Sequence, residues 1–457
     1  ALSGKLFGGL LPWHDAARLA SLVFGASFLA ILSRTAHQLV GGSAALAAPL
    51  LTIGTLGLLV PMHEAQPAIV GLCGFIVSLW GLSIWRSVPL RGGLVFGVGV
   101  GVGFLGTGMD SAVIQLATGL LLTVHPAWRI RGSLFAWLGA IAVALVLMLP
   151  WPLLLKLQTP ALFDIWWTAE LASLELVGGF SRDHVELLAW ASWPLLPLAL
   201  WSLWLERRRV FQAPTFLLLA ATAPALLSFF ADVPRPTALM PALVPLALLA
   251  TVGVGRLRRG AANAFDWFGM MTFTLVAALI WLGGISILTG EPARVAKNFS
   301  KPAPGFVAEA SFVAILIAIA VTVAWITVML RTPRTPWRAA ARWSIGLTTI
   351  WVLLMALWLP WIDYGKTYRS VSAEFRQALG KPQGCIARRS LGLAQRASFD
   401  YFSGIRTVGG NRAKECLYLI SQATSRSATE LPGWALMLET SRPGDKNERL
   451  RLYRRAE

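Results

Sequence analysis

The sequence predicts an all-α polytopic membrane protein with a small carboxy-terminal α+β domain. Apolar runs long enough to cross a bilayer as helices follow one another up to about residue 361. Arginines are concentrated in alternate gaps between these runs. The chain is also 56% hydrophobic and only 14% charged. A soluble protein of 457 residues does not have such a composition, so a membrane protein is the class that fits.

We predict about twelve transmembrane helices from apolar runs of roughly 17 to 25 residues. Two of the runs are short, and the run at 111–124 fits either a full span or half of a re-entrant pair with the run before it. The predicted spans are residues 19–32, 44–60, 68–85, 92–108, 111–124, 134–155, 187–205, 214–230, 237–254, 271–289, 310–330 and 343–361.

The positions of the arginines predict the orientation of the chain in the membrane. Short loops with positive charge resist translocation, so the gaps rich in arginine are expected in the cytoplasm. The gaps at 61–66 and 231–236 carry few cations and are expected outside, as is everything after the last span. The arginines expected inside are Arg34, Arg86, Arg91, Arg129, Arg131, Arg207, Arg208, Arg209, Arg256, Arg258, Arg259, Arg331, Arg334, Arg338 and Arg342.

The net charge of +18 has two explanations, nucleic acid and anionic lipid. Most arginines lie in short loops or next to predicted spans, where they face lipid headgroups. We therefore expect the bilayer, and not nucleic acid, as the partner of these cations.

Two connections between spans have patterns of their own. Near 160–177, within an exterior loop, apolar and polar residues occupy opposite sides at helical spacing, which predicts an amphipathic helix in the membrane interface. Its apolar side comprises Phe163, Trp166, Trp167, Leu171 and Leu174, and its polar side comprises Asp164, Glu170, Ser173 and Glu175. Residues 260–269 (GAANAFDWFG) are expected to form an inner loop.

The sequence divides into a transmembrane domain, 1–362, and a charged tail, 363–457. In the tail, residues 385–388, 415–421, 434–439 and 450–453 are predicted strands, and 394–402 is a predicted helix. Cys385 and Cys416 form a disulfide if the tail is exterior, or stay reduced on neighbouring buried strands. The sequence leaves both alternatives open.

Alternating glycines mark the run VFGVGVGVGFLGTG, at positions 97, 99, 101 and 103. The run is superficially similar to a nucleotide-binding glycine loop, but it has no strand before it and no polar helix after it. Small residues that allow close helix packing in lipid are the preferred interpretation.

Several features occur in the order seen in one membrane-enzyme superfamily. They are the Ala17-Arg18-Leu19 triplet after a short apolar stretch, Pro150-Trp151 at the end of a span, SFFADVPRPTALMPALVPLALLA, FDWFG, WLPWIDYGKTYR, RPGD and ERLRLYRR. The chain resembles GT-C glycosyltransferases of the bacterial aminoarabinose (lipid A) transferase and dolichyl-phosphate-mannose protein mannosyltransferase kind. The closing motifs are most similar to betaproteobacterial members.

This resemblance implies transfer of a sugar, with inversion, from a polyprenyl phosphate to lipid A or another periplasmic acceptor. It implies a multi-pass enzyme in the bacterial inner membrane with a periplasmic tail. Such an enzyme needs a carboxylate to act on the acceptor, cations for the departing phosphate and an apolar groove for the isoprenoid. The resemblance places the main base in a loop ahead of Ala1, so we expect an amino-terminal helix and catalytic loop to precede this chain.

The candidate site residues follow from this mechanism. Glu64 is the candidate accessory acid, against the alternative of a solvated turn. Arg235, Lys366 and Arg369 are the candidate phosphate contacts, and a local ion pair with Asp232 is the competing explanation for Arg235. The resemblance also suggests His184 as a ligand of a divalent metal, although no cofactor is required.

Asp110 lies at a turn where many relatives carry a lysine, so it is either a functional acid or a helix cap. Two other classes of function stay open for the chain as a whole. One is a transporter or flippase of a lipid-linked glycan, which needs broken helices and internal pseudo-symmetry. The other is a non-catalytic scaffold without a cleft. Neither the sugar nor the acceptor is identified by the sequence.

Overall fold

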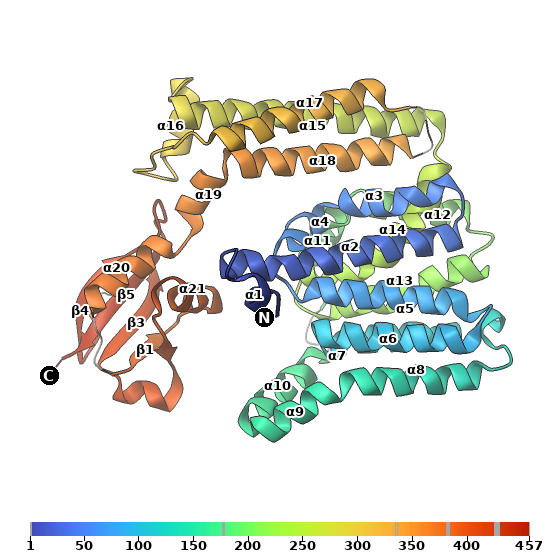
Figure 1. Cartoon of the computed structure of the whole chain (residues 1–457), viewed down its shortest axis with the longest axis horizontal. Coiled ribbons are helices and arrows are strands. Elements are labelled where there is room, and N and C mark those ends of the chain that lie inside the picture. Colours follow the sequence, from blue (N-terminus) through green and yellow to red (C-terminus); the bar gives the residue numbers. More distant parts are fainter. Residues whose placement is uncertain are drawn as a thin grey trace. The chain divides into compact units, whose positions relative to one another are not determined.

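The computed structural model describes residues 2–175, 179–333, 335, 337–380, 384–424 and 430–456. Arg334 and residues 176–178, at the end of the predicted interface helix, lie outside these ranges. The chain forms two compact units. The first comprises Ala1–Phe273 and Trp325–Thr348, and the second comprises Thr274–Ala324 and Thr349–Glu457. The borders fall inside three long helices, α15, α17 and α18 (Figure 1).

Nine helices of the described ranges are long and apolar enough to cross a membrane. Each corresponds to one of the predicted spans, so the prediction of a polytopic α-helical membrane protein is confirmed. These helices are α2 (Trp13–Leu39), α5 (Ala68–Trp85), α6 (Pro89–Thr107), α8 with α9 (Ser133–Gln158), α13 (Ala213–Ala231), α14 (Pro236–Gly255), α15 (Arg259–Thr289), α17 (Phe312–Arg331) and α18 (Arg338–Leu357).

Three predicted spans are not single long helices. Residues 44–60 form the short pieces η1 (Ser43–Leu46), α3 (Ala47–Ile53) and α4 (Leu56–Leu59). Residues 111–124 correspond to the 14-residue helix α7 (Met109–Leu122). The predicted span 187–205 consists of α11 (Arg182–Ala191) and α12 (Leu195–Leu205), which are bent by 88° and make a tenth span if counted together. The described residues thus contain nine or ten candidate spans, and the count of about twelve stays a prediction.

Physical causes for two of the breaks can be named. The Gly54 carbonyl, at the end of α3, accepts a hydrogen bond of 2.7 Å from the Trp343 indole of α18 instead of continuing a helical ladder. Pro194 follows α11 and has no N–H to continue a helix through the bend.

Alternating glycines allow α6 to pack closely on both sides. A Cβ at Gly97 would lie 2.3 Å from the Ala140 carbonyl oxygen of α8. A Cβ at Gly99 would lie 2.4 Å from the Ser78 backbone nitrogen of α5. Figure 1 shows α5, α6 and α8 side by side. The prediction that these glycines serve helix packing is confirmed.

Residues 260–269 are the start of α15, so the prediction of an inner loop was wrong. Asp266 is buried there, and its carboxylate forms ion pairs with Arg338 and Arg342 of α18. The nitrogen–oxygen distance is 2.8 Å in both pairs. A buried carboxylate needs such partners, and these join α15 to α18 within the first unit. The partners are more than 70 residues away in the sequence, so the local pattern did not show them.

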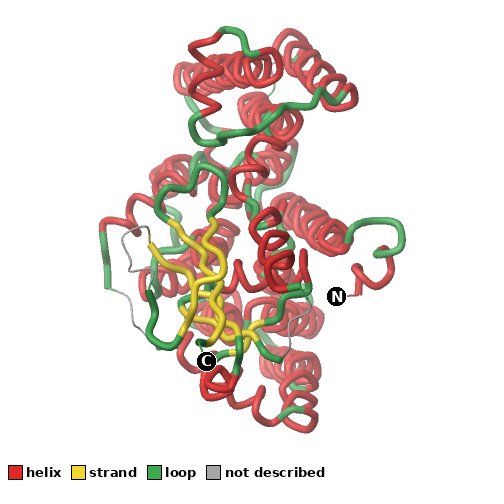
Figure 2. Tube along the Cα trace, turned by 90° about the vertical axis from the view of Figure 1, so that its left-hand side faces the viewer, coloured by secondary structure: helices red, strands yellow, loops and turns green. Residues whose placement is uncertain are grey.

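The tail is an α+β fold, as predicted. Its strands form one sheet, drawn in yellow in Figure 2. The sheet has the order β2-β1-β3-β5-β4, with β1 parallel to both neighbours and β5 antiparallel to β3 and β4. The strands are β1 (Ile386–Arg389), β2 (Thr407–Val408), β3 (Tyr418–Thr424), β4 (Trp434–Thr440) and β5 (Glu448–Arg455). Helix α21 (Leu393–Ser403) was predicted, whereas α20 (Arg369–Leu379) and β2 were not.

Helices α20 and α21 pack on the sheet through a small apolar core. Phe375 of α20 and Phe399 of α21 are fully buried together with Ile420 and Leu452 of the sheet. Cys385, just before β1, and Cys416, just before β3, are joined in a disulfide with their Cα atoms 4.8 Å apart. The oxidised alternative is the one that the structure contains.

Candidate functional site

A cavity of about 530 Å³ lies at one end of the helices of the first unit. It is formed by the end of α6, the first turns of α7, the end of α10 (Pro160–Ser173), the end of α13 and the start of α14. Because α13 ends at Ala231 and α14 begins at Pro236, the loop 232–235 lies in the cavity wall. The predicted residue Arg235 is in this wall.

Arg235 is held by a carboxylate of its own loop. One of its terminal nitrogens donates to the Asp232 carboxylate, whose other oxygen accepts a bond of 2.6 Å from the Val233 backbone N–H. The local ion pair considered from the sequence is therefore present. The Arg235 side chain nevertheless remains 59% exposed. A guanidinium has five N–H donors, so the pair leaves donors free for an anion in the cavity.

His184 of α11 holds the same loop in place through a hydrogen bond. Its Nε2 donates to the Asp232 carbonyl at 2.9 Å, and its Nδ1 accepts from the Ser181 hydroxyl at 2.8 Å. The ring is buried against Phe229 and Phe230. With both nitrogens occupied, His184 does not fit the role of metal ligand that we predicted. Among the described residues no group of three His, Cys, Asp or Glu side chains is placed to hold a metal. The structure makes His184 a support of the loop 232–235.

Glu64 lies beside the cavity and not in its wall. It follows the short helix η2 (Pro61–His63) and is exposed. The Gln66 side-chain amide donates to the Glu64 carboxylate, and Gln66 itself lines the cavity. The Ser21 hydroxyl of α2 donates to the Glu64 carbonyl at 2.8 Å, which ties this loop to the bundle. Glu64 therefore contacts a side chain that lines the cavity, Gln66, without lining the cavity itself.

Asp110 is part of the cavity wall and does not cap a helix. The N-cap of α7 is Gly108, and no side chain caps it. The Asp110 carboxylate accepts a hydrogen bond of 2.7 Å from Ser228 of α13. Both residues line the cavity, so the contact joins two of its walls.

The predicted interface helix corresponds to α10, which is preceded by α9 (Pro150–Gln158). Its polar side is not uniformly solvated, because the Glu170 carboxylate accepts a bond of 2.7 Å from the Met109 N–H at the start of α7. A negative charge is stabilised at a helix N-terminus. Trp166 packs edge-on against Phe104 of α6. Glu170 therefore fixes α10 next to the cavity, a role that sequence reasoning missed.

A signal for the role of Glu170 does exist in the sequence. Gly108 separates two apolar helical runs, and it is followed by a helix without a Ser, Thr, Asn or Asp cap. Such a start needs an acceptor from elsewhere in the chain. The sequence did not show which residue supplies it.

Lys366 and Arg369 belong to the second unit, and Lys366 lines a cavity there. That cavity has a volume of about 450 Å³, and its cationic lining residues are Lys366, Arg442 and Lys446. Arg369 instead lies over the Phe402 ring, with its guanidinium carbon 5.0 Å from the ring centre. The two residues that we predicted as one phosphate group are therefore in different surroundings.

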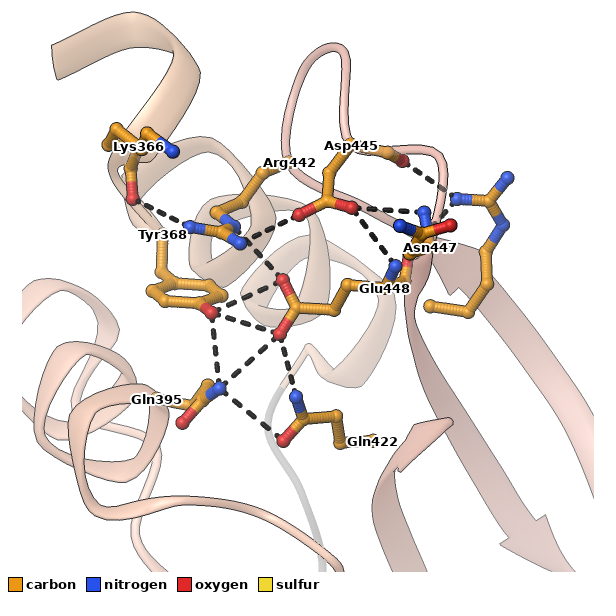
Figure 3. Close-up of polar contacts among 9 residues, drawn as sticks. Lys366, Tyr368, Gln395, Gln422, Arg442, Asp445, Asn447 and Glu448 are labelled. Carbon is orange, nitrogen blue, oxygen red and sulfur yellow. Dashed lines mark hydrogen bonds and ion pairs between the residues drawn. The ribbon is translucent and has the colours of Figure 1, made fainter. Parts of the chain in front are cut away.

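A polar network holds Arg442 beside this second cavity (Figure 3). The buried Glu448 carboxylate accepts bonds of 2.9 Å from the Arg442 Nε and from the Tyr368 hydroxyl. Gln395 and Gln422 also donate to Glu448. Burial, followed by the neighbouring Glu448, raises the pKa of the Tyr368 hydroxyl. The network joins α20, α21 and the sheet at the point where the cavity forms.

Asp445 completes this network from the turn between β4 and β5. Its carboxylate accepts bonds of 3.0 Å from the Glu448 and Asn447 backbone N–H groups and pairs with Arg442 at 2.7 Å. The backbone N–H of Glu448 is the main cause that lowers the pKa of Asp445, and Asn447 and Arg442 act in the same direction.

Several curated proteins with similar sequences are named undecaprenyl phosphate-alpha-4-amino-4-deoxy-L-arabinose arabinosyl transferase. The protein of Pseudomonas aeruginosa PAO1 is 30% identical over 305 residues, which cover 62% of this chain and 51% of the relative. The protein of Photorhabdus laumondii is 26% identical over 257 residues, 52% of this chain and 44% of the relative. The chain thus spans about half the length of the curated relatives it matches. No model of a protein family matches it.

Among solved structures, this chain is similar to the crystal structure of ArnT from Cupriavidus metallidurans bound to undecaprenyl phosphate. The match covers 98% of this chain and 85% of the ArnT chain. Its TM-score is 0.64 at 15% sequence identity. The apo crystal structure of the same protein gives a TM-score of 0.64 at 16% identity. The chain is similar in sequence and fold to aminoarabinose transferases. The resemblance inferred from the order of motifs is confirmed.

The likeness to aminoarabinose transferases covers both units, because nearly the whole chain is matched by the ArnT fold. The site residues are placed only by the geometry described above. Of the residues predicted for the site, Arg235 and Asp110 lie in one cavity wall and Glu64 lies beside it.

Proposed function

We propose that the protein transfers a 4-amino-4-deoxy-arabinose-type sugar from undecaprenyl phosphate to lipid A or a similar lipid. The reaction takes place on the periplasmic side of the bacterial inner membrane. The arginine-poor loop 232–235 then faces the periplasm, and so does the tail with its Cys385–Cys416 disulfide. The 1–362 and 363–457 division remains a proposal, and its border falls inside α19 (Leu359–Lys366).

The observation that carries the proposal is the pairing of Arg235 with an apolar wall in one cavity. Val113 and Ile114 of α7 and Leu227 of α13 form part of this wall. A polyprenyl phosphate has an anionic head on an apolar chain, so it needs both kinds of surface next to each other. A guanidinium binds phosphate through parallel N–H donors, and this type of bond is stronger than one between neutral groups.

The carboxylates of the cavity favour an amino sugar over a neutral one. Asp232 is engaged by Arg235, whereas no described basic side chain forms an ion pair with Asp110 or Glu175, which line the same cavity. A 4-amino sugar on a phosphate has a positive and a negative group. Two carboxylates and one guanidinium are complementary to these two charges.

In an inverting transfer, an acceptor oxygen attacks the anomeric carbon from the side opposite to the phosphate. The bond between that carbon and the phosphate oxygen breaks, the phosphate leaves with the polyprenyl chain, and the acceptor proton passes to a carboxylate. Arg235 would stabilise the departing phosphate, and Glu64 would act as the accessory acid through its contact with Gln66.

The second cavity is proposed to bind a phosphate of the acceptor lipid. Lys366, Arg442 and Lys446 supply three cations there, and the only acidic side chain in the described lining, Asp445, is already paired with Arg442. Arg369, at the start of α20, is retained as a further phosphate contact. No metal is included in this mechanism, because both nitrogens of His184 are occupied.

Binding of undecaprenyl phosphate to the purified protein tests the role of Arg235. We expect Arg235→Ala to weaken binding at least tenfold, because a charge-assisted bond to phosphate contributes about 1.5 to 3 kcal/mol. Arg235→Lys should weaken it less, since the charge remains while the planar fork is lost. Arg182→Ala is the matched control, because Arg182 forms an exposed local pair with Glu186 and does not line the cavity.

Equal affinity of Arg235→Ala and wild type would remove Arg235 from the donor site. It would then be only the partner of Asp232, and the phosphate site should be sought around Lys366.

A further inference from the structure

A second binding site is indicated at the other end of the first unit, away from the cavity with Arg235. There a cavity of about 910 Å³ lies between α2, η1, α5 and α6. Its lining includes Arg34 and His37 of α2, Trp80 and Ser87 near the end of α5, and Arg91 of α6. The proposed transfer reaction uses none of these residues.

Helix geometry separates the two cavities. On α2, Ser21 contacts the Glu64 loop beside the cavity with Arg235. Arg34 follows 13 residues later and lines the cavity with Arg91. A rise of about 1.5 Å per residue gives a separation of roughly 20 Å along α2. On α6, Thr107 lines the cavity with Arg235, and Arg91 lines the cavity with Arg34. These two residues are 16 positions apart. The cavity with Arg34 and Arg91 therefore lies at the arginine-rich end of these spans.

The charge of this cavity is positive and uncompensated. No acidic side chain is among its lining residues, and no described carboxylate forms an ion pair with Arg34 or Arg91. Arg34 lies over the Trp80 ring, 5.2 Å from its centre, which orients the guanidinium without neutralising it. Two arginines without carboxylates are the arrangement expected for an anion with a phosphate group.

The rim of the cavity indicates that the anion has acyl chains. Leu46 and Val88 line the cavity and are 48% and 47% exposed. Leu46 ends η1 and Val88 directly precedes α6, and α2 and α6 are candidate membrane spans, so we expect these side chains at the boundary of the bilayer. A soluble phosphate compound would gain nothing from this apolar rim, whereas an acyl chain would cover it.

We propose that this cavity binds the headgroup of an anionic phospholipid, with Arg34 and Arg91 on its phosphate and the acyl chains on the rim near Leu46 and Val88. The ligand is a structural lipid of the leaflet at the arginine-rich end. It is not the sugar donor or acceptor, so the proposal does not depend on the transferase activity.

Native mass spectrometry of the purified protein, titrated with phosphatidylglycerol, tests this site. We expect Arg34→Gln with Arg91→Gln to weaken binding of one phosphatidylglycerol at least tenfold. Arg207→Gln is the matched control, because Arg207 also stacks on a tryptophan, Trp204, but lines neither this cavity nor the first. Phosphatidylcholine, which has the same phosphodiester and no net charge, should bind at least tenfold more weakly than phosphatidylglycerol.

A filling substitution tests the cavity with both arginines intact. Ser87 is exposed in the cavity wall, and Ser87→Trp should reduce phosphatidylglycerol binding as strongly as the double variant does. Unchanged binding in either variant would overturn the proposal. An equal loss in Arg207→Gln would also overturn it, because attraction would then be general. So would inorganic phosphate that displaces the lipid at similar concentration, because the ligand would then be a soluble phosphate.

Discussion

Single residues in this protein are fixed by partners at very different distances along the chain. Asp232 and Arg235 are three residues apart, so the sequence offered their ion pair as one explanation of Arg235 and predicted the loop that carries them. His184 is 48 residues from its acceptor at Asp232, and Glu170 is 61 residues from Met109. No local pattern shows such contacts. The sequence therefore placed Glu170 only on the polar side of an interface helix, and the resemblance suggested His184 only as a metal ligand.

Asp445 should make the stability of the tail depend on pH. The folded tail lowers the pKa of Asp445 below its ordinary value of 3.8. The unfolded chain therefore takes up this proton at a higher pH than the folded chain. The ionised carboxylate stabilises the tail above about pH 4, and that contribution is lost as the pH falls through the lowered pKa.

Hydrogen exchange of peptides covering 442–455, corrected for the intrinsic exchange rate, measures this effect in the full chain. Asp445→Asn should lose protection above pH 4 and show a flatter pH dependence below it. Asp400→Asn, which removes a carboxylate from an exposed pair with Arg406, should behave like wild type. If protection of 442–455 in Asp445→Asn keeps the wild-type pH dependence, this carboxylate does not stabilise the turn.

At the scale of elements, the sequence predicted long apolar helices well and broken ones badly. The spans α5 and α14 match their predicted ranges within one residue at each end, because apolar length is a property of the local sequence. The break at Gly54 depends on Trp343, 289 residues later. Four strands of the tail followed from alternation and composition. Helix α20 was missed although Val371, Phe375 and Leu379 recur at a helical spacing of four.

The close approach of α6 and α8 leads to a prediction about helix packing. Gly97→Ala should destabilise the first unit by roughly 1 to 3 kcal/mol, because its Cβ would meet the Ala140 backbone. Gly260→Ala is the control, since nothing lies within 4 Å of a Cβ there. Alanine has the higher helix propensity, so that variant should be neutral or more stable by up to about 1 kcal/mol.

Cys73 provides the readout for this pair of variants. It is buried in α5 and is the free cysteine of the described chain, so its reaction with a fluorogenic thiol reagent on heating reports unfolding of the first unit. Gly97→Ala should lower the temperature of reaction relative to Gly260→Ala. Equal temperatures would mean that α6 and α8 can separate without cost.

At the scale of the whole molecule, the order of weak motifs predicted more than any single residue did. The order indicated the resemblance to aminoarabinose transferases, and the similarity in sequence and in fold to these proteins confirms it. It did not predict that compact units divide within α15, α17 and α18, because that division depends on packing between distant segments. Two cavities of the first unit, one with Arg235 and one with Arg34, give its ends separate roles in our proposals.

Mass spectrometry of lipid A tests the proposed function most directly. The intact gene product is expressed in a bacterial strain that makes the undecaprenyl-linked amino sugar but lacks its own transferase. We expect lipid A to gain aminoarabinose with the wild type and with Arg182→Ala, and to lose at least nine tenths of this modification with Arg235→Ala. Unmodified lipid A with the wild type would contradict the proposed reaction. Wild-type modification with Arg235→Ala would contradict the placement of the donor phosphate in the first cavity.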